Sequence, residues 1–231
     1  MSKIKIREHP RYYNVYISGN IAKPKLFTKN LVPGKSIYGE KRILFHGIEY
    51  RKWNPYRSKL AALLLKNPEI NPFKEGQHCL YLGASTGTTI SHLSDILLEG
   101  IIYGVEFAER SMRQLIQNIK KRKNIIPILG DARYPEEYAR NIFSEVDLIY
   151  QDVAQPNQAE IAIVNSNYYL KNDGIIIMAV KSQSIDSITK PEKVFANEKK
   201  KLENEGFKII ESVNIHDYAA NHVIFVIKRN Q

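Results

Sequence analysis

From residue 54 onward, short apolar runs alternate with longer stretches in which apolar residues recur at helical spacing. The apolar runs predict strands at residues 78–83, 101–107, 125–129, 146–153 and 174–181. Between them, the spacing predicts helices at residues 88–98, 109–122, 135–143 and 157–170. One face of the helix at 109–122 carries Met112, Leu115, Ile116 and Ile119. This alternation predicts a parallel sheet covered by helices on both faces.

Two further segments frame this alternation. Asn54 followed by Pro55 is typical of a helix start, and it predicts a helix that runs to about residue 66. A charged helix is predicted at residues 191–205, and two β-prone runs follow at residues 207–216 and 223–228. Because a short loop separates these two runs, we expect them to pair antiparallel.

The first 53 residues have a different pattern, with short β-prone pieces and no helical periodicity. Glycine, proline and asparagine residues separate the pieces, which lie at residues 4–6, 12–17, 26–28, 42–45 and 48–51. This pattern predicts a small β-hairpin domain at residues 1–53 and an α/β domain at residues 54–231. The predicted fold class is therefore α/β with a small N-terminal β-rich domain.

The composition is that of a globular, intracellular protein. The chain has 231 residues, 43% of them hydrophobic, and its longest apolar runs have six residues, whereas a membrane helix needs about 20. The N-terminus has no apolar signal region, which argues against secretion. A single cysteine, Cys79, excludes an internal disulfide and a cysteine-based metal site. We therefore expect a reducing compartment and no membrane partner.

Positive charge is concentrated in the first quarter of the chain. Residues 1–60 contain 14 lysines and arginines and three acidic residues, whereas residues 61–231 contain 20 basic and 21 acidic residues. This asymmetry favours a polyanionic partner, of which RNA or DNA is the commonest. A solubilising surface is the simpler alternative.

Four of these cations, Arg51, Lys52, Arg57 and Lys59, lie at the start of the first predicted helix. The helix dipole disfavours cations at this position by about 0.3–1 kcal/mol each, and a bound anion would offset that cost. Arg51, Lys52 and Arg57 are therefore candidates for binding RNA phosphates. Lys59 lies two residues after Arg57 and points to a different face, so it is free to turn toward a site.

The loop after the strand at 78–83 has the glycines of a ligand-binding turn. In Leu82-Gly-Ala-Ser-Thr-Gly-Thr-Thr89, two glycines bracket a tight turn into a helix, whose N-terminus offers free N–H groups. A dinucleotide fingerprint fails because Ser85 and Thr88 replace two of its glycines, and a phosphate loop fails because no lysine follows Gly87. The spacing of Gly83 and Gly87 resembles instead the first motif of Rossmann-like methyltransferases that bind S-adenosylmethionine. An ordinary strand–helix turn is the alternative.

Acidic residues lie at the ends of the next two predicted strands. Glu106 lies at the end of 101–107, where a carboxylate is placed to accept from both hydroxyls of a ribose. Asp131 follows 125–129, where a carboxylate can accept from an adenine amino group. Each acid alone is more often a helix cap, but three successive strand ends with suitable groups favour a nucleoside ligand.

Asp152 and Lys181 lie at the ends of the fourth and fifth predicted strands, and neighbouring strand ends would bring them together. A carboxylate there is costly unless it is hydrated, paired or in use. The two residues therefore form either a structural ion pair or part of a reaction centre. His222 opens the last β-run and joins them only if its strand lies beside the fifth. The six histidines share no metal-ligand spacing, and no metal site is predicted.

These residues lie in segments that resemble the fibrillarin family, the methyltransferases of box C/D guide-RNA particles. The resemblance covers essentially the whole chain. Its most specific segments are Asp152-Val-Ala-Gln-Pro156 and Trp53-Asn-Pro-Tyr-Arg-Ser-Lys-Leu60. Further matching segments are Tyr81-Leu-Gly-Ala-Ser-Thr-Gly-Thr-Thr89, Val105-Glu-Phe107, Gly130-Asp-Ala-Arg133 and Ile185-Asp-Ser187.

The resemblance implies a seven-stranded Rossmann-like methyltransferase domain. It implies transfer of a methyl group from S-adenosylmethionine to ribose 2′-oxygens of rRNA, and of tRNA in some archaea. The catalytic set that it implies is Lys59, Asp152, Lys181 and His222. The cofactor contacts that it implies are Gly83, Ala84, Thr88, Thr89, Glu106, Phe107, Asp131, Ala132, Asp152, Val153, Ala154 and Gln155.

In the mechanism that we expect, a ribose 2′-oxygen attacks the methyl group in line. Lys181 in its neutral form is the candidate general base, and Asp152 orients it and favours the cationic sulfonium. Lys59 steadies the developing alkoxide, and His222 completes the hydrogen-bond network.

The implied partners are a box C/D guide RNA with its target RNA, a Nop-domain scaffold protein and a kink-turn-binding ribosomal-type protein. The sequence lacks the Gly/Arg-rich tail of eukaryotic members, which favours the cytoplasm over the nucleolus. Two other hypotheses stay open. One is a non-catalytic subunit of an RNA particle, and the other is a nicotinamide oxidoreductase, against which the failed glycine pattern argues.

Overall fold

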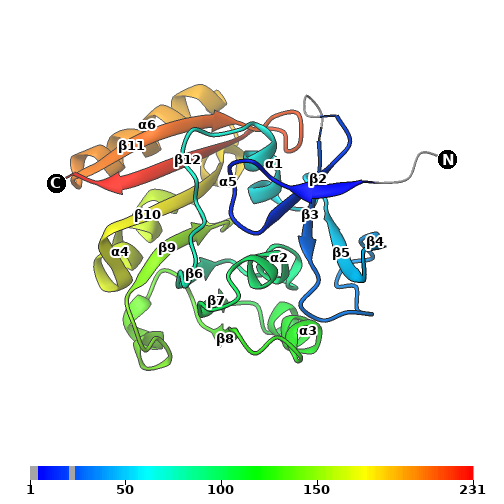
Figure 1. Ribbon diagram of the computed structural model, residues 1–231. Helices are drawn as coiled ribbons and strands as arrows, with labels where there is room; N and C mark the ends of the chain where they lie inside the picture. The colour runs from blue at the N-terminus through cyan, green and yellow to red at the C-terminus, as the bar shows by residue number, and fades with distance from the viewer. Residues whose placement is uncertain (1–4, 21–23, 231) are drawn as a thin grey trace.

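The computed structural model describes residues 5–20 and 24–230, and these residues form two sheets (Figure 1). The smaller sheet is antiparallel, with the strand order β1-β2-β3-β5-β4. Its strands are β1 (Ile6–Glu8), β2 (Val15–Ser18), β3 (Lys25–Lys29), β4 (Arg42–Phe45) and β5 (Ile48–Trp53). The predicted β-prone pieces thus become strands of one sheet, although residue 4 lies outside the described residues.

The larger sheet has seven strands in the order β11-β12-β10-β9-β6-β7-β8. The strands from β6 to β10 run parallel, and β12 runs antiparallel to both β10 and β11. Their bounds are β6 (Cys79–Leu82), β7 (Ile102–Glu106), β8 (Ile125–Leu129), β9 (Val146–Gln151), β10 (Leu170–Lys181), β11 (Phe207–Asn214) and β12 (His222–Arg229). The predicted α/β fold, with a seven-stranded sheet and an N-terminal β-rich part, is confirmed.

The pairing of β11 with β12 contains one irregularity. Ile209 pairs with Ile227 and Glu211 pairs with Val226, so that Ile210 is an extra residue on β11. An extra residue of this kind is a β-bulge, which fixes the register of the strands on either side of it.

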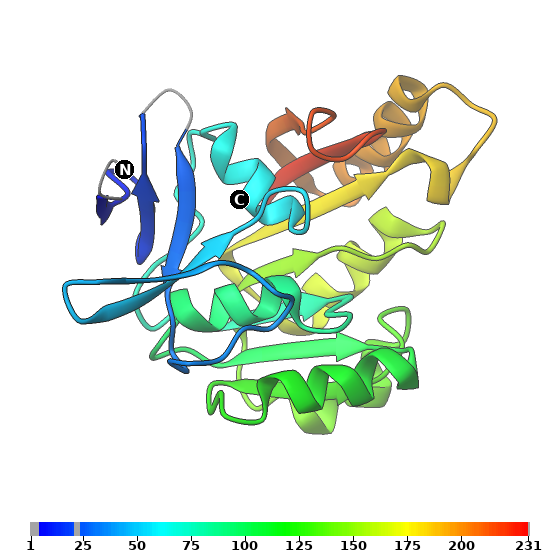
Figure 2. The ribbon, with the colours of Figure 1, turned by 90° about the vertical axis from the view of Figure 1, so that its right-hand side faces the viewer.

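Helices cover both faces of the larger sheet. The face that carries the N-terminal sheet is covered by α1 (Lys59–Leu65), α2 (Thr88–Ile96) and α3 (Glu109–Ile119), as Figures 1 and 2 show. The other face is covered by α4 (Gln158–Tyr169), α6 (Pro191–Asn204) and the 3₁₀ helix η1 (Pro135–Asn141). Because side chains alternate along a strand, Leu148 and Tyr150 of β9 enter the first core and Ile149 enters the second.

The N-terminal sheet shares its main core with the larger sheet. Val15 of β2 and Trp53 of β5 belong to the same hydrophobic cluster as Leu60 of α1 and Leu93 of α2. The predicted boundary after residue 53 therefore separates two sheets but not two cores, and the division into domains stays a prediction.

A buried set of charges, which we call the interface cluster, joins the two parts of the chain. It consists of Glu40, Arg51, Asp95 and Arg122. Arg51 donates to Glu40 Oε1 at 2.6 Å and to Asp95 Oδ2 at 2.8 Å, and Arg122 donates to Asp95 Oδ1 at 2.6 Å. The Arg51 side chain is 0% exposed. Its burial argues against the predicted role of Arg51 in RNA binding, because two carboxylates already match its charge.

The helix α1 begins at Lys59, so the predicted start at residue 54 is wrong. Ser58 is the N-cap, and its hydroxyl accepts from Ala61 N at 3.4 Å. Asn54 instead closes a turn, in which its carbonyl accepts from Arg57 N at 3.0 Å and its side chain accepts from Tyr56 N at 3.0 Å. Asn before Pro favours turns as well as helix starts, and here the turn forms.

Other differences are local. The segment predicted as a helix at 135–143 is the 3₁₀ helix η1, and the short helix α5 (Ser182–Ile185) was not predicted. Ile116 is 48% exposed, although its spacing places it beside the apolar face of α3. Among residues 5–20 and 24–230, no helix is both long enough and apolar enough to cross a membrane.

Candidate active site

A cavity of about 490 Å³ opens at the carboxyl ends of β6, β9 and β10. Four predicted catalytic residues line it, and we call them the catalytic cluster: Lys59, Asp152, Lys181 and His222. They come from the start of α1, the ends of β9 and β10, and the start of β12. This edge of an open α/β sheet is where ligands bind.

Lys59 reaches the cavity because the start of α1 is anchored to α2. The Ser58 hydroxyl caps α1 and also accepts from Thr89 Oγ1 at 3.0 Å. The next residue, Lys59, then places its Nζ 2.8 Å from Asp152 Oδ1 and 2.9 Å from Asp152 Oδ2. The side chains are 26% and 22% exposed, so water reaches both ions and the pair contributes little to stability.

Asp152 is held by close contact between the ends of β6 and β9. Its backbone N–H donates to Leu82 O at 2.9 Å. Gly83 has a φ of +87°, and a Cβ at this position would lie 2.3 Å from Asp152 O. Only glycine permits this approach, which explains why the loop needs a glycine at its first position.

Lys181 and His222 face each other across the pairing of β10 with β12, in which they are register partners. The condition for including His222, a strand beside the fifth predicted strand, is therefore met. His222 Nδ1 lies 2.7 Å from Ala220 O, and a proton on Nδ1 leaves Nε2 as an acceptor. Burial lowers the pKa of His222, and the nearby Lys59 and Lys181 lower it further, against the opposing effects of the hydrogen bond to Ala220 O and of Asp152.

The ion pair at the strand ends differs from the expected one. Asp152 pairs with Lys59, and Lys181 makes no ion pair with any residue of the described ranges 5–20 and 24–230. The catalytic cluster thus contains two lysines and one carboxylate, and Lys181 is the lysine without an acidic partner among the described residues.

A second cavity of about 220 Å³ adjoins the first at Gly83, Asp152 and Val153. Glu106 and the 63% exposed ring of Phe107 line it. The Glu106 carboxylate accepts from Ser85 N at 2.8 Å and from Ala108 N at 2.9 Å. Each oxygen therefore keeps a second lone pair, while the two bonds fix the loop after β6 against the end of β7.

The predicted cofactor residues almost all line one of these two cavities. Those that do are Gly83, Ala84, Thr88, Thr89, Glu106, Phe107, Ala132, Asp152, Val153, Ala154 and Gln155. Asp131 lines neither. Its carboxylate accepts hydrogen bonds from Arg133 Nη2 at 2.6 Å and from Gln155 Nε2 at 3.3 Å. The hydrogen bond from Arg133 lowers the pKa of Asp131.

The predicted RNA contacts Lys52 and Arg57 lie beside the catalytic cluster. Arg57 is exposed and lines the 490 Å³ cavity, and its guanidinium lies 5.9 Å from the centre of the Tyr38 ring. Lys52 and Arg57 also line a neighbouring depression of about 270 Å³. Arg57 is therefore placed at the mouth of the cavity, and Lys52 lies in the neighbouring depression.

Sequence reasoning missed four residues that line the larger cavity, namely Tyr81, Ser85, Thr86 and Ala219. Tyr81 lies in β6, two positions before the predicted cofactor residue Gly83, and this closeness in sequence was an available signal. Ala219 belongs to the segment between β11 and β12, and no sequence pattern points to it.

The two adjoining cavities have the size and the groups that S-adenosylmethionine needs. Their volumes fall within the usual range of small-molecule sites, about 300–1,000 Å³ when joined. Glu106 offers acceptors for ribose hydroxyls, Phe107 offers an exposed ring, and Asp152 offers a negative charge near a sulfonium. Within the described part of the chain, no three His, Cys, Asp or Glu side chains are grouped so as to hold a metal ion.

Comparison with known protein sequences points to one family. A family model described as Fibrillarin matches residues 6–231. A curated protein of Methanocaldococcus jannaschii, named fibrillarin-like rRNA/tRNA 2′-O-methyltransferase, is 47% identical over 227 residues, which are 98% of this chain and 97% of that protein.

Solved structures agree with the sequence comparison. Aeropyrum pernix fibrillarin with natively bound S-adenosyl-L-methionine has a TM-score of 0.89 and 44% identity, with 98% of this chain and 100% of that chain covered. A fibrillarin/Nop5p complex contains a chain with a TM-score of 0.83 and 42% identity, with 94% and 98% covered.

Proposed function

The chain belongs to the fibrillarin family and is a methyltransferase of that family, and from this premise we propose that it methylates ribose 2′-oxygens under the direction of a box C/D guide RNA. The substrates that we propose are rRNA and tRNA, the two that the name of the M. jannaschii relative contains. The observation that carries the proposal is the catalytic cluster around one cavity, next to a second cavity with groups for a nucleoside.

We propose S-adenosylmethionine as the methyl donor, as in the A. pernix relative. Glu106 would accept from the ribose hydroxyls, Phe107 would pack on the adenine, and the backbone of residues 83–88 would hold the methionine part. Asp131, tied to Arg133, would act on the adenine side by fixing Gln155 rather than by direct contact. When bound, the cofactor supplies an electrophilic methyl group.

The residues of the catalytic cluster would then have separate tasks. Lys181, which has no carboxylate partner among the described residues, would first lose its own proton to solvent and then accept the proton of the ribose 2′-hydroxyl at Nζ as the oxygen attacks. Lys59, fixed by Asp152, stabilises the negative charge that develops on that oxygen. His222 Nε2 accepts a hydrogen bond from Lys181 or from the substrate, since its Nδ1 is held by Ala220 O.

We also propose a Nop-domain scaffold protein as a partner, because a relative was solved in a complex with Nop5p. A kink-turn-binding protein and the guide RNA would complete the particle, and the cytoplasm is the location that the sequence favours. In such a particle, base pairing by the guide selects the nucleotide, so the chain itself needs only to recognise ribose and phosphate.

The test is methyl transfer from labelled S-adenosylmethionine to a matched target RNA, with scaffold, kink-turn protein and guide present. The control target carries a 2′-deoxyribose at the selected nucleotide. We expect label on the ribose target and none on the control. Equal labelling of both would assign the chemistry to a base. Binding of the cofactor without any transfer would favour a non-catalytic subunit.

A further inference from the structure

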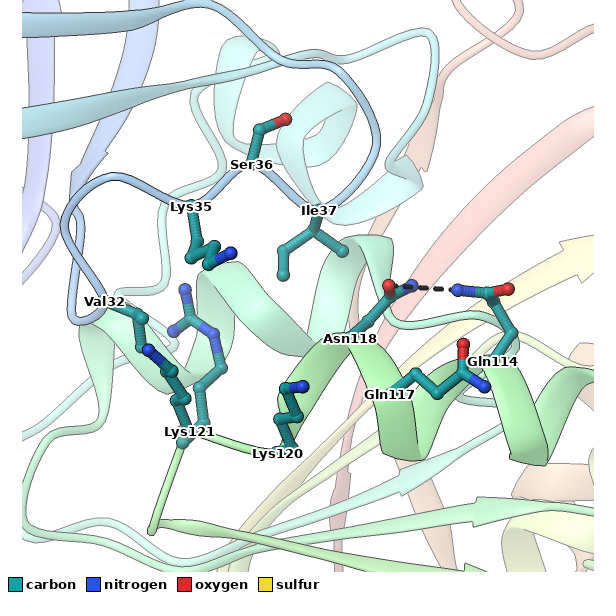
Figure 3. A pocket seen from close by; sticks show the side chains of 10 residues that line it. Val32, Lys35, Ser36, Ile37, Gln114, Gln117, Asn118, Lys120 and Lys121 are labelled. Carbon is teal, nitrogen blue, oxygen red and sulfur yellow. Dashed lines mark hydrogen bonds between the residues drawn. The ribbon is translucent and has the colours of Figure 1, made fainter.

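We propose that a groove between residues 32–37 and α3 binds the phosphate backbone of the RNA duplex next to the target nucleotide. The groove has a volume of about 530 Å³ and none of the catalytic or cofactor residues lines it (Figure 3). Lys35 and Ile37 extend from the loop above, and side chains of α3 and of the residues after it rise from below. The proposal rests on the proposed function only in taking RNA as the polyanion.

Three exposed lysines from two separate elements meet in this groove. Lys35 belongs to the segment between β3 and β4, whereas Lys120 and Lys121 follow α3. None of the three forms an ion pair with a residue of the described ranges, and no acidic side chain of those ranges lines the groove. Unmatched cations that converge from two elements favour an anionic ligand.

A row of amides continues the groove along α3. Gln114, Gln117 and Asn118 lie at i, i+3 and i+4, so they share one face of the helix. Gln114 Nε2 donates to Asn118 Oδ1 at 3.1 Å, as the dashed line in Figure 3 shows. Side-chain amides are frequent donors to phosphate and sugar oxygens, which they contact without reading the sequence.

Arg122 adds a buried donor to the wall of the groove. Its side chain is 1% exposed, and its Nη1 is taken by Asp95 and Ser94. Its Nε–H has no hydrogen-bond partner among residues 5–20 and 24–230. An unpaired buried donor is rare and costly, so this position on the wall of the groove is under-satisfied.

The groove begins directly behind the loop that opens into the catalytic cavity. Asn118, which lines the groove, donates from Nδ2 to Thr86 O at 2.7 Å. Thr86 lines the catalytic cavity. A duplex whose target ribose lies in that cavity can therefore continue over this loop and along α3 toward Lys120 and Lys121.

A plain solvated surface explains only part of these observations. Lysines after a helix are favoured by the negative end of its dipole, which accounts for Lys120. The dipole accounts neither for Lys35, which lies on another element, nor for the unpaired donor of Arg122.

The test compares two full-length variants that lose the same charge. The groove variant carries Lys35→Gln, Lys120→Gln and Lys121→Gln. The control variant carries Lys193→Gln, Lys200→Gln and Lys208→Gln, three exposed lysines without ion pairs in the described ranges, on α6 and β11 at the opposite edge of the sheet. The probe is a fluorescent 14-base-pair RNA duplex, and its dissociation constant is measured by anisotropy between 50 and 300 mM salt.

We expect the groove variant to bind the duplex about tenfold more weakly at 100 mM salt, with a salt slope reduced by about 2 to 3. The control variant should bind within about twofold of the unchanged protein. A third variant with arginine at the three groove positions should keep its affinity, because the charge remains. Both glutamine variants should bind S-adenosylmethionine normally, which shows that they are folded.

Equal losses in the two glutamine variants, or no loss in the groove variant, would overturn the proposal. Unchanged RNA affinity combined with lost affinity for the scaffold protein would also overturn it and would assign the groove to a protein partner. Methyl transfer in the assembled particle is measured separately. Its absence with the unchanged protein would refute the proposed function and leave the binding comparison intact.

Discussion

The interface cluster and the catalytic cluster combine the same kinds of side chains but differ in burial and in charge balance. In the interface cluster, Arg51 and Asp95 are 0% exposed, and two arginines meet two carboxylates. In the catalytic cluster, Lys59 and Asp152 are 26% and 22% exposed, and two lysines meet one carboxylate. The charges of the first set balance one another without a ligand, whereas the second has a surplus lysine that lines an open cavity.

This difference separates a structural role from a chemical one. Buried charges persist only when they are paired, and the two arginines and two carboxylates of the interface cluster already balance one another. The catalytic cluster is hydrated, so that it tolerates an excess of positive charge and can meet a negative charge during a reaction. Composition alone does not distinguish the two sets, but burial and balance do.

The largest effect that we expect is the loss of turnover on Asp152→Asn. The amide keeps the shape of the side chain but no longer fixes Lys59 by charge, and turnover should fall by about 10²–10⁴-fold. Because the pair is hydrated, the free energy of unfolding should change by less than about 1 kcal/mol. Methyl transfer by the assembled particle and thermal unfolding of the isolated chain measure the two effects. A large loss of stability without loss of turnover would remove the contrast between the clusters.

The matching change in the interface cluster is Asp95→Asn, which should act on stability instead. It leaves Arg51 and Arg122 buried with too little negative charge, and the free energy of unfolding should fall by about 3–5 kcal/mol. Turnover per folded molecule should stay near normal. The control is Glu109→Gln, which removes an exposed ion pair with Arg113 and should cost less than about 1 kcal/mol. Urea unfolding gives both values, and equal effects of the two changes would contradict the structural role of the interface cluster.

A smaller effect is expected from pH, through the buried His92 beside the interface cluster. Its Nδ1 forms a hydrogen bond with Thr28 Oγ1 at 2.8 Å, and its Nε2 forms one with the Tyr38 hydroxyl at 2.8 Å. Burial, followed by Arg51 and Arg122, holds the pKa of His92 well below its ordinary value of 6.5. The unfolded chain therefore binds a proton that the folded chain rejects, so stability is full above pH 6.5 and is lost as the pH falls below it.

The slope should reach about 1.4 kcal/mol per pH unit for this one group. In His92→Gln, this part of the slope should disappear, although the protein is less stable at every pH. In His216→Gln, which changes an exposed histidine, the slope should remain. Chemical unfolding at several values of pH between 5 and 8 tests this, and an unchanged slope in His92→Gln would show that His92 is not the group responsible.

The smallest effect that we expect is that of Arg57→Gln, which removes an exposed positive charge beside the catalytic cluster. RNA affinity should fall by a few-fold, and the salt slope should decrease by about 1. Stability and cofactor affinity should not change, because Arg57 is exposed. Anisotropy with the RNA duplex measures the loss. No change in affinity would limit the anion-binding surface to the groove beside α3.

The sequence predicted the architecture from its alternating strands and helices, and it predicted most of the candidate active site from the positions of strand ends. Alternating strands and helices determine a parallel sheet, and the carboxyl ends of such strands meet at one edge. Asp152, Lys181 and Glu106 were therefore predictable from their positions alone. His222 depended on strand order, which local patterns do not contain, and the structure supplied it through the pairing of β10 with β12.

Other properties depend on contacts between distant residues, and the sequence did not contain them in a readable form. Arg51 looked like a free cation because its partners Glu40 and Asp95 lie on other elements. The start of α1 depended on the bond between Ser58 and Thr89. In each case, charge or spacing was visible and the partner was not.

The bulge at Ile210 affects which strand alignments the folded protein can adopt. A slip of β12 by two residues would keep every side chain on its own face of the sheet, so that burial would oppose it only weakly. Such a slip would nevertheless move His222 about 7 Å away from Lys181. The bulge in the pairing of β11 with β12 holds β12 in one alignment with β11, so that a slip of β12 past β10 has to displace both strands together. An irregularity at the edge of the sheet thereby disfavours folded molecules whose strands are misaligned and which would be inactive.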